Sequence, residues 1–312
     1  MTIKKMDERE QHFSVASSTG KKLFLRYLPP TLDDHGVVLY VHGATFPSAL
    51  SIAHRFDGQS WRDDLVAHGF HVWALDFLGF GHSDRYAEMA HPAEASSPLC
   101  RAADAGTQVA AALDFISAHH TGRRVSIIAH SWGSMAACRA AAEKAGIVER
   151  IVLFAPISRR DSGHATATAP GWKLVSLEDQ WTRFNADTPE GETPVLLERH
   201  FAEWGERYLD SDPHSRTRVP PSVQVPLGPT QEIQQAWSGE LAYDPASVTA
   251  PLAIIRGAWD SLCTDADAAW LFEAFTQSPL KRDIKLSRGG HLMHLEEGRT
   301  ELHRTSREFL TL

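Results

Sequence analysis

Residues 129–133 read Ala-His-Ser-Trp-Gly and set a serine where a strand-like segment gives way to a helix-forming one. The preceding run, 124–129, is β-branched and apolar, as a buried parallel strand requires. The following run, 134–144, is rich in Ala and favours a helix. A serine at such a junction is expected in a tight, strained turn that lifts its hydroxyl above the sheet edge, with small neighbours that allow close packing. The pentapeptide therefore predicts serine chemistry at Ser131.

Short apolar segments alternate with helical patterns along most of the chain. This rhythm is typical of the α/β class, in which helices cover both faces of a mostly parallel sheet. Residues 12–17 and 22–28 are predicted to form an antiparallel opening pair. Further core strands are predicted over 37–41, 71–75, 124–129, 151–154, 252–256 and 283–286. Helices are predicted over 60–68, 101–119, 134–144, 265–275 and 296–309. We therefore expect one mostly parallel eight-stranded sheet flanked by helices.

The stretch 157–245 breaks this rhythm. It contains four tryptophans, clustered prolines and amphipathic segments such as 195–209. Because it is inserted between two predicted core strands, we expect a mostly helical cap over the carboxyl edge of the sheet, where ligands of open α/β sheets bind. The predicted division is a core of 1–156 and 246–312 with a cap, or lid, of 157–245. The tryptophans indicate either an apolar or aromatic substrate or a small core within the cap itself.

Composition narrows the class of protein. The chain has 312 residues, of which 43% are hydrophobic and 22% charged, as in an ordinary globular protein with a large core. The formal net charge of −8 argues against nucleic acid or an anionic membrane as a partner. The first residues are charged and lack the apolar region of a secretory signal, and no run approaches the roughly 18 apolar residues of a membrane span. Three widely spaced cysteines predict reduced thiols and not a disulfide framework or a thiolate metal site. We therefore expect a cytoplasmic monomer or homodimer that acts on a small molecule and needs no cofactor.

The predicted strand 37–41 ends in His42-Gly43-Ala44-Thr45. A tight turn at this point aims backbone N–H groups at the space above the serine. The N–H groups of Ala44 and Trp132 are therefore expected to form an oxyanion hole.

The next predicted strand leads into residues 76–84, Asp-Phe-Leu-Gly-Phe-Gly-His-Ser-Asp. The two glycines suggest a dinucleotide-binding fingerprint, but that motif needs a third Gly where Asp84 stands. We expect a structural loop in which Asp76 and Ser83 serve as hydrogen-bonding anchors.

An acid candidate follows the predicted strand 252–256. Asp260 stands in a short turn from which its carboxylate reaches a histidine on the next loop and stabilises the imidazolium. Asp265 and Asp267 are the alternatives. They fall at the start of the next predicted helix, where an acidic residue is expected as a cap or as a partner of the helix dipole.

The base candidate follows the last predicted strand. Two glycines, Gly289 and Gly290, precede His291 and let the backbone present its imidazole to the serine. His294 is the rival base. The spacing of the two histidines also suits one face of a metal-binding helix, but no third ligand stands at a recognisable distance in the sequence, so no metal site is predicted.

The chain order Ser131, Asp260, His291 is the order found in α/β-hydrolases. On these residues and the turns around them, the chain resembles the α/β-hydrolase superfamily with a helical cap. It departs from the family pattern by Ala129 in place of the first Gly of the serine motif, and by the lack of a Gly-rich continuation after Ala44. The resemblance implies a cofactor-independent serine hydrolase. We expect a carboxylic ester hydrolase that cleaves a small to medium apolar ester through an acyl-enzyme.

Other activities fit the same three residues. The serine motif is similar to that of proline iminopeptidases, in which case Glu198, Glu203 and Glu206 bind a substrate amine, unless they form a solvated helix face. In a C–C bond hydrolase, Arg159 and Arg160 bind a substrate carboxylate. A different class is a ligand-binding protein without catalysis on the same fold. Haloalkane dehalogenases and epoxide hydrolases need a carboxylate nucleophile, so a serine argues against both.

Three residues are expected to contact the substrate. His130 adjoins the serine, Arg159 follows the predicted strand 151–154, and Trp181 lies in the predicted cap.

Overall fold

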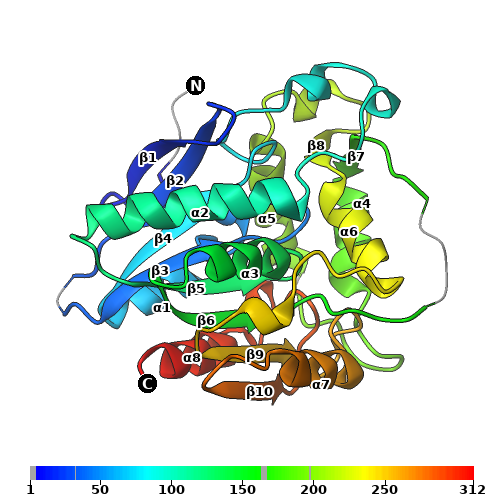
Figure 1. Cartoon of the computed structure of the whole chain (residues 1–312). Helices are drawn as coiled ribbons and strands as arrows, with labels where there is room; N and C mark the ends of the chain where they lie inside the picture. The colour runs from blue at the N-terminus through cyan, green and yellow to red at the C-terminus, as the bar shows by residue number, and fades with distance from the viewer. Residues whose placement is uncertain (1–4, 32, 163–166, 197) are drawn as a thin grey trace.

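A central sheet of eight strands runs through the molecule with helices on both faces (Figure 1). The computed structural model describes residues 5–31, 33–162, 167–196 and 198–312. The strand order is β1-β2-β4-β3-β5-β6-β9-β10. Strand β2 is antiparallel to β1 and β4, and every later pair is parallel. The predicted fold class and the antiparallel opening pair are confirmed.

The strands span Gln11–Ala16 (β1), Lys22–Leu28 (β2), Gly36–Val41 (β3), Phe70–Asp76 (β4), Val125–His130 (β5), Val148–Phe154 (β6), Leu252–Gly257 (β9) and Lys281–Leu286 (β10). The helices of the core span Trp61–Ala67 (α1), Ala102–His119 (α2), Gly133–Glu143 (α3), Asp265–Ala274 (α7) and Arg299–Leu310 (α8). All eight predicted strands form: the bounds of β2 match the prediction, and those of the other strands differ by at most three residues. The last helix begins at Arg299 and not at 296, because a short 3-10 turn, Met293–Leu295, precedes it.

Alternating side chains of the central strands feed two hydrophobic layers. Leu39 and Ile127 pack with residues of α2 and α3, whereas Val38 and Ile128 pack with residues of α1 and α8. Strands β3, β5 and β9 are buried along their whole length. This explains why they read as continuous apolar runs, since both faces of a parallel sheet are covered.

Most of the inserted segment, whose described residues are 157–162, 167–196 and 198–245, lies at one end of the sheet, to the right in Figure 1. It contains the helices Leu177–Asn185 (α4), Glu198–Asp210 (α5) and Gly228–Trp237 (α6). It also contains an antiparallel pair of strands, Trp172–Ser176 (β7) and Ser222–Pro226 (β8), which the expectation of a mostly helical cap did not include. The two strands are about 50 residues apart in sequence, so no local hairpin signal marks them.

Helices α4 and α5 lie over the turns that follow β3. The indole N–H of Trp204 donates to the carbonyl of Leu50 at 2.9 Å, and its ring stacks on Tyr208 with centroids 5.0 Å apart. Phe184 packs edge-on against Trp204 at 4.7 Å. These aromatic side chains therefore join the inserted segment to the main hydrophobic core.

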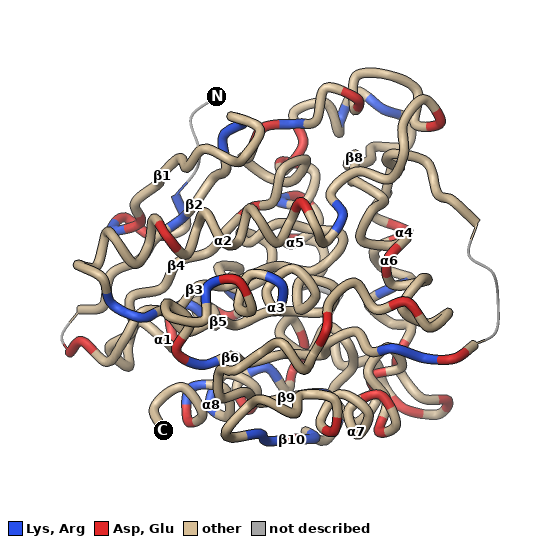
Figure 2. The backbone as a smooth tube through the Cα atoms, viewed as in Figure 1, with Lys and Arg blue, Asp and Glu red and all other residues tan. Residues whose placement is uncertain are grey.

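Charged residues of both signs are interspersed along the backbone in Figure 2. Within the described ranges, none of the helices has the length and apolar character that crossing a bilayer requires.

Candidate active site

Ser131 occupies the turn between β5 and α3. Its φ of 56° lies in the left-handed region, where a residue with a side chain is strained by about 1–3 kcal/mol. Its N–H donates to the carbonyl of Phe154 at 3.0 Å, and its carbonyl accepts from the N–H of Ser134 at 2.9 Å. The neighbouring strand and helix thus hold the strained backbone, which confirms the turn predicted from the sequence.

The same turn packs directly on the end of β3. A Cβ at Gly133 would lie only 2.3 Å from the carbonyl oxygen of His42, so a larger residue is excluded there. The ring of His42 is fixed in turn, because its Nδ1 donates to the carbonyl of Gly43 at 2.8 Å and its Nε2 accepts from the N–H of Phe77 at 3.1 Å. The turns after β3 and β5 therefore form one rigid unit.

Three side chains meet at this edge of the sheet, from the loops after β5, β9 and β10. The Oγ of Ser131 lies 2.8 Å from Nε2 of His291. The Nδ1 of His291 lies 3.0 and 3.2 Å from the two carboxylate oxygens of Asp260. All three residues are at most 5% exposed. This geometry suits the transfer of the serine proton to an imidazole whose opposite nitrogen is held by a carboxylate.

Asp260 is itself oriented by the backbone that follows it. Its Oδ1 accepts from the N–H groups of Leu262 and Cys263, both at 2.9 Å. The two alternative acids have other partners. Asp267 forms a capping box with Thr264 at the start of α7, and Asp265 pairs with Lys285 at 2.9 Å. The structure therefore brings only Asp260, of the three candidates, to His291.

The N–H groups expected to form an oxyanion hole lie on both sides of the junction. Ala44 and Trp132 are buried, and within the described part of the chain their backbone N–H groups donate to no protein acceptor. The indole of Trp132 is anchored separately, by a 2.9 Å hydrogen bond to Glu232. Unpaired, buried donors beside a serine are what an oxyanion hole requires.

The loop of residues 76–84 has the structural role expected of it. Asp76 Oδ1 accepts from the N–H and Oγ of Ser48 at 3.0 and 2.5 Å, and Oδ2 accepts from the N–H of His82 at 3.1 Å. Ser83 donates to the carbonyl of Asp76 and accepts from the N–H of Phe24 at 2.8 Å. Burial raises the pKa of Asp76, but the charge of Arg26 and its other polar neighbours bring it below its usual value. Both predicted anchors are confirmed.

The loop that carries His291 is held by two carboxyl groups that sequence reasoning missed. Asp187, just beyond α4, accepts from the N–H of His291 at 2.7 Å through Oδ2. Its Oδ1 accepts from the N–H and Oγ of Ser261 at 3.2 and 2.5 Å. The inserted segment therefore links the loop of the base to the loop of the acid. An acidic residue after an amphipathic helix carries no motif, so the sequence holds no signal for this role.

Glu296 is the second carboxyl group that supports the loop carrying His291. Its Oε2 accepts from the N–H of Gly290 at 2.9 Å. A Cβ at Gly290 would lie 2.9 Å from that of Asp187 and 3.0 Å from Oε1 of Glu296, so the two carboxyl groups enclose this glycine. Burial, with the nearby charges of Asp187 and Asp260, raises the pKa of Glu296 to about 8. This role also explains why α8 begins after Glu296, which the sequence placed inside the helix.

His294, the rival base, lies elsewhere. It is buried, with its ring centroid 4.6 Å from that of His130 and 5.4 Å from that of Phe154. Neither ring nitrogen has a hydrogen-bond partner among the described residues. Burial, together with the neighbouring His291, holds the pKa of His294 well below its usual value, so the ring is neutral. The structure places His291, and not His294, beside the serine.

His130 does not take the position expected of a substrate contact. It is 1% exposed, stacks on Phe154, and lies 3.0 Å through Nε2 from the carbonyl of His291. Side chains alternate along β5, so His130 points to the same face as Ile128, towards α8. From this face of the sheet it supports the loop that carries His291. Burial and the neighbouring imidazoles hold its pKa well below the usual value.

The arginines after β6 have local partners. Arg159 donates to the carbonyl of Gly239 at 2.9 Å and to Asp161 at 2.8 Å. Arg160 forms a two-pronged ion pair with Asp267 at 2.8 and 2.6 Å and lies over the ring of Trp237. The structure therefore does not bring Arg159 to the serine, because its guanidinium is engaged at the base of the inserted segment.

The remaining candidates lie in the inserted segment. The ring of Trp181 packs edge-on against Phe201 at 4.9 Å, and the side chain is half-buried. Glu203 pairs with Arg207 at 2.7 Å and Glu206 with Arg216 at 3.0 Å, with both carboxylates exposed. These two glutamates form the solvated helix face considered above. The side chain of Glu198 lies outside the described residues.

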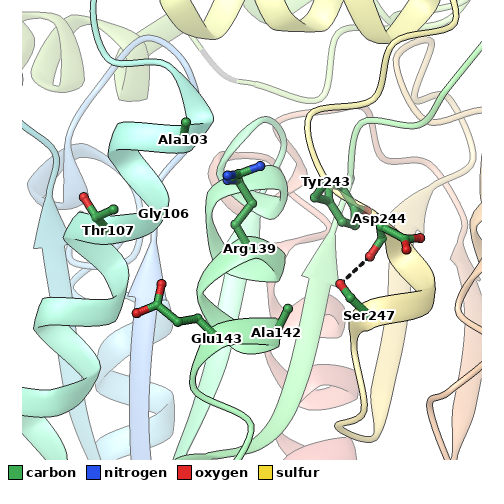
Figure 3. A pocket seen from close by; sticks show the side chains of 9 residues that line it. All are labelled: Ala103, Gly106, Thr107, Arg139, Ala142, Glu143, Tyr243, Asp244 and Ser247. Atoms are coloured by element: carbon green, nitrogen blue, oxygen red, sulfur yellow. Dashed lines mark hydrogen bonds between the residues drawn. The ribbon is translucent and has the colours of Figure 1, made fainter.

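A hollow of 310 Å³ lies on a different part of the molecule, between α2, α3 and the segment before β9 (Figure 3). Arg139 stands at its centre and donates to the carbonyl of Ala242 at 2.6 Å. Ser131, Asp260 and His291 are not among its lining residues, so it is separate from the candidate site.

Comparison with known proteins relates the chain to a family. The model of the alpha/beta hydrolase fold matches residues 36–298. A comparison with curated proteins finds no match. Among solved structures, the chain is similar to an enol-lactonase from Burkholderia xenovorans, with 16% identity, a TM-score of 0.61 and coverage of 96% of this chain and 100% of that one.

Two further structures show the same likeness. An esterase from Exiguobacterium antarcticum has 14% identity, a TM-score of 0.63 and coverage of 97% and 100%. An epoxide hydrolase from Vigna radiata has 15% identity, a TM-score of 0.61 and coverage of 97% and 98%. At these identities the likeness shows the fold, and the family match over most of the chain shows that this protein belongs to the α/β-hydrolase family.

Proposed function

We propose that this protein is a cofactor-independent serine hydrolase that cleaves carboxylic esters through an acyl-enzyme. The observation that carries the proposal is the hydrogen-bonded series from Ser131 Oγ to His291 Nε2 at 2.8 Å and from His291 Nδ1 to Asp260 at 3.0 Å. The three side chains come from separate loops, and their hydrogen-bonded geometry is the one that nucleophilic serine catalysis needs.

In this mechanism His291 takes the proton of Ser131 as Oγ attacks the acyl carbon. The negative oxygen of the tetrahedral intermediate accepts from the N–H groups of Ala44 and Trp132, each worth about 3 kcal/mol in the transition state. His291 then gives its proton to the leaving alcohol. Water attacks the acyl-enzyme while His291 takes its proton, and collapse of the second intermediate releases the acid and returns the proton to Ser131.

The proposal includes a division of labour within the chain. Residues 1–156 and 246–312 form the catalytic core, and 157–245 form a lid that selects the substrate. The supporting observation is that Ser131 is 1% exposed while α4 and α5 contact the turns after β3.

The alternatives have weaker support. An epoxide hydrolase needs a carboxylate where Ser131 stands. An aminopeptidase site built on Glu203 and Glu206 requires breaking two surface ion pairs. A C–C bond hydrolase that binds its substrate through Arg159 or Arg160 requires breaking the ion pair of that arginine with Asp161 or Asp267. A purely ligand-binding protein has no need of a hydrogen-bonded serine, histidine and carboxylate.

A fluorophosphonate probe tests the nucleophile. Wild-type protein should be labelled and Ser131→Ala should not, while the neighbouring Ser134→Ala, in the same turn, should still be labelled. Turnover of p-nitrophenyl butyrate should follow the same pattern. Labelling of Ser131→Ala at the wild-type rate contradicts the assignment.

A second pair of variants tests the base. Acylation should collapse in His291→Ala and persist in His294→Ala, and the reverse result reassigns the base. Hydrolysis of prolyl-naphthylamide without turnover of p-nitrophenyl esters would replace the esterase proposal by the aminopeptidase.

A further inference from the structure

Arg183 extends from the last turn of α4 towards the turn that follows β3. Its Nη1 donates to the hydroxyl of Thr45, and its guanidinium carbon lies 5.9 Å from the ring centroid of Phe46. Thr45 directly follows Ala44, one of the two expected oxyanion donors. A cation of the inserted segment therefore reaches the rim of the proposed active site.

The charge of Arg183 has no carboxylate partner within ion-pair distance in the described part of the chain. Two other arginines of the inserted segment have carboxylate partners: Arg207 pairs with Glu203, and Arg216 pairs with Glu206 and Asp210. Asp187, four residues after Arg183, instead directs its two oxygens to Ser261 and His291. Those two hydrogen bonds leave this carboxylate facing the catalytic loops.

The guanidinium also retains free donors. Apart from the bond from Nη1, it makes no hydrogen bond to the described residues. None of its nitrogens is among the buried atoms that are sealed from solvent without a partner. The side chain of Arg183 is half-buried, so the N–H groups that make no hydrogen bond within the described residues face a space open to a bound molecule.

The surroundings of Arg183 favour an anion. Burial lowers its pKa to about 10, although Tyr208 and Asp187 act in the opposite direction, so the group is charged at neutral pH. Its charge contributes to the low pKa of His130 and His294, which flank the proposed base. A partly desolvated cation without a counter-ion is costly, and an anion with two oxygens relieves that cost through the fork of the guanidinium.

We propose that Arg183 binds a carboxylate of the substrate, so that the natural ester carries an acidic group besides the bond that is cleaved. This inference rests on the proposed esterase activity and differs from the apolar substrate expected from the sequence. Two substrate classes satisfy it: half-esters of dicarboxylic acids, with the carboxylate on the acyl side, and acylated hydroxy acids, with the carboxylate on the leaving alcohol.

Matched ester pairs test the proposal. The acyl-side set is monoethyl malonate, succinate, glutarate and adipate, each compared with the ethyl ester of the monocarboxylic acid of equal carbon number. The alcohol-side set is O-acetylglycolate, O-acetyllactate and 3-acetoxybutyrate, compared with ethyl acetate. Acid release in a pH-stat gives kcat/KM for each, and the ratio of acidic to neutral substrate is the readout.

Wild-type protein should prefer the acidic member in one of the two sets. Arg183→Gln should lower the ratio by roughly 10- to 100-fold, mainly through KM, because a charge-assisted hydrogen bond to the substrate is lost. Arg183→Lys should keep part of the preference, since the charge remains without the fork. Arg216→Gln, a surface arginine of the same segment, should leave the ratio unchanged. Melting temperatures of all variants separate loss of folding from loss of selectivity.

A preference for neutral esters in both sets, or an equal ratio in wild type and Arg183→Gln, overturns the proposal. A binding test that needs no turnover keeps it separate from the esterase proposal. Succinate, glutarate or adipate should raise the melting temperature of wild-type protein but not that of Arg183→Gln, and glutaramide should raise neither. Stabilisation of both proteins to the same degree, or of neither, also overturns it, whatever the result of the fluorophosphonate experiment.

Discussion

The sheet core and the inserted segment contribute to the candidate site in different ways. The core supplies Ser131 and Asp260 from the ends of the fully buried strands β5 and β9, and His291 from the loop after the edge strand β10. The inserted segment reaches the same place through single polar contacts, with Asp187 on the loop of the base and Arg183 on the turn after β3. Strand packing fixes the positions of the core side chains through many contacts, whereas one substitution removes an isolated polar contact. Under the proposed function, reactivity and selectivity therefore rest on parts of the chain with different tolerance to mutation.

The largest effect is expected from the acid of the core. Asp260→Asn should lower kcat on p-nitrophenyl butyrate by about 10³- to 10⁴-fold, because an amide neither holds the reactive tautomer of His291 nor stabilises the imidazolium. Asp265→Asn is the matched control, since that carboxylate pairs with Lys285 on the surface. Equal losses in the two variants would break the distinction between Asp260 and the alternative acids.

The next effect concerns stability of the core. Glu296 holds its proton up to about pH 8 when folded, against an ordinary value of 4.5, so unfolding between these pH values releases a proton. The contribution of Glu296 to the free energy of unfolding should therefore fall as pH rises through this window, by an amount on the order of a few kcal/mol, while buried neutral histidines such as His294 contribute in the opposite direction in all variants. Glu296→Gln keeps an acceptor for Gly290 and should lose this slope. Urea unfolding at pH 5, 6.5 and 8 measures it.

Glu297→Gln serves as the control for that experiment, because the side chain of Glu297 is exposed. It should retain the wild-type slope. If Glu296→Gln shows the same slope as the wild type, Glu296 is already ionised in the folded protein.

A moderate effect is expected from the inserted segment. Asp187→Ala removes the acceptor of the His291 N–H and should lower kcat by roughly 10- to 100-fold through misplacement of the base. The rate of fluorophosphonate labelling should fall in parallel, while the melting temperature changes little. Glu190→Ala, an exposed residue of the same segment, should match the wild type. An unchanged labelling rate in Asp187→Ala would mean that the core positions His291 unaided.

The smallest effect belongs to the surface of the same segment. Glu203→Gln breaks an exposed pair with Arg207 and should cost less than about 0.5 kcal/mol, with no change in ester turnover. Chemical unfolding and the p-nitrophenyl butyrate assay measure the two quantities. A selective loss of activity on prolyl-naphthylamide would instead revive the aminopeptidase.

The same contrast between the sheet core and the inserted segment explains which site residues could be predicted from the sequence. Ser131, Asp260 and His291 each follow a parallel strand, and parallel strands bring their carboxyl ends to one edge, so local patterns locate all three. Arg183 and Asp187 belong to a segment whose strands, β7 and β8, pair across about 50 residues. No periodicity or motif encodes such contacts. The substrate contact expected of His130 differs from its observed position for a simpler reason. A residue adjacent to Ser131 in the sequence does not point its side chain in the same direction.

The enclosure of Gly290 between Asp187 and Glu296 has a consequence for protein engineering. Grafting the residues 157–245 of another family member onto this core would remove Asp187 and leave the amide of His291 without its acceptor. Such a chimera is expected to fold but to have low catalytic activity until an acceptor for the backbone N–H of His291 is restored. The inserted segment of this protein is thus not an exchangeable module, because a transplanted segment must first restore this one hydrogen bond.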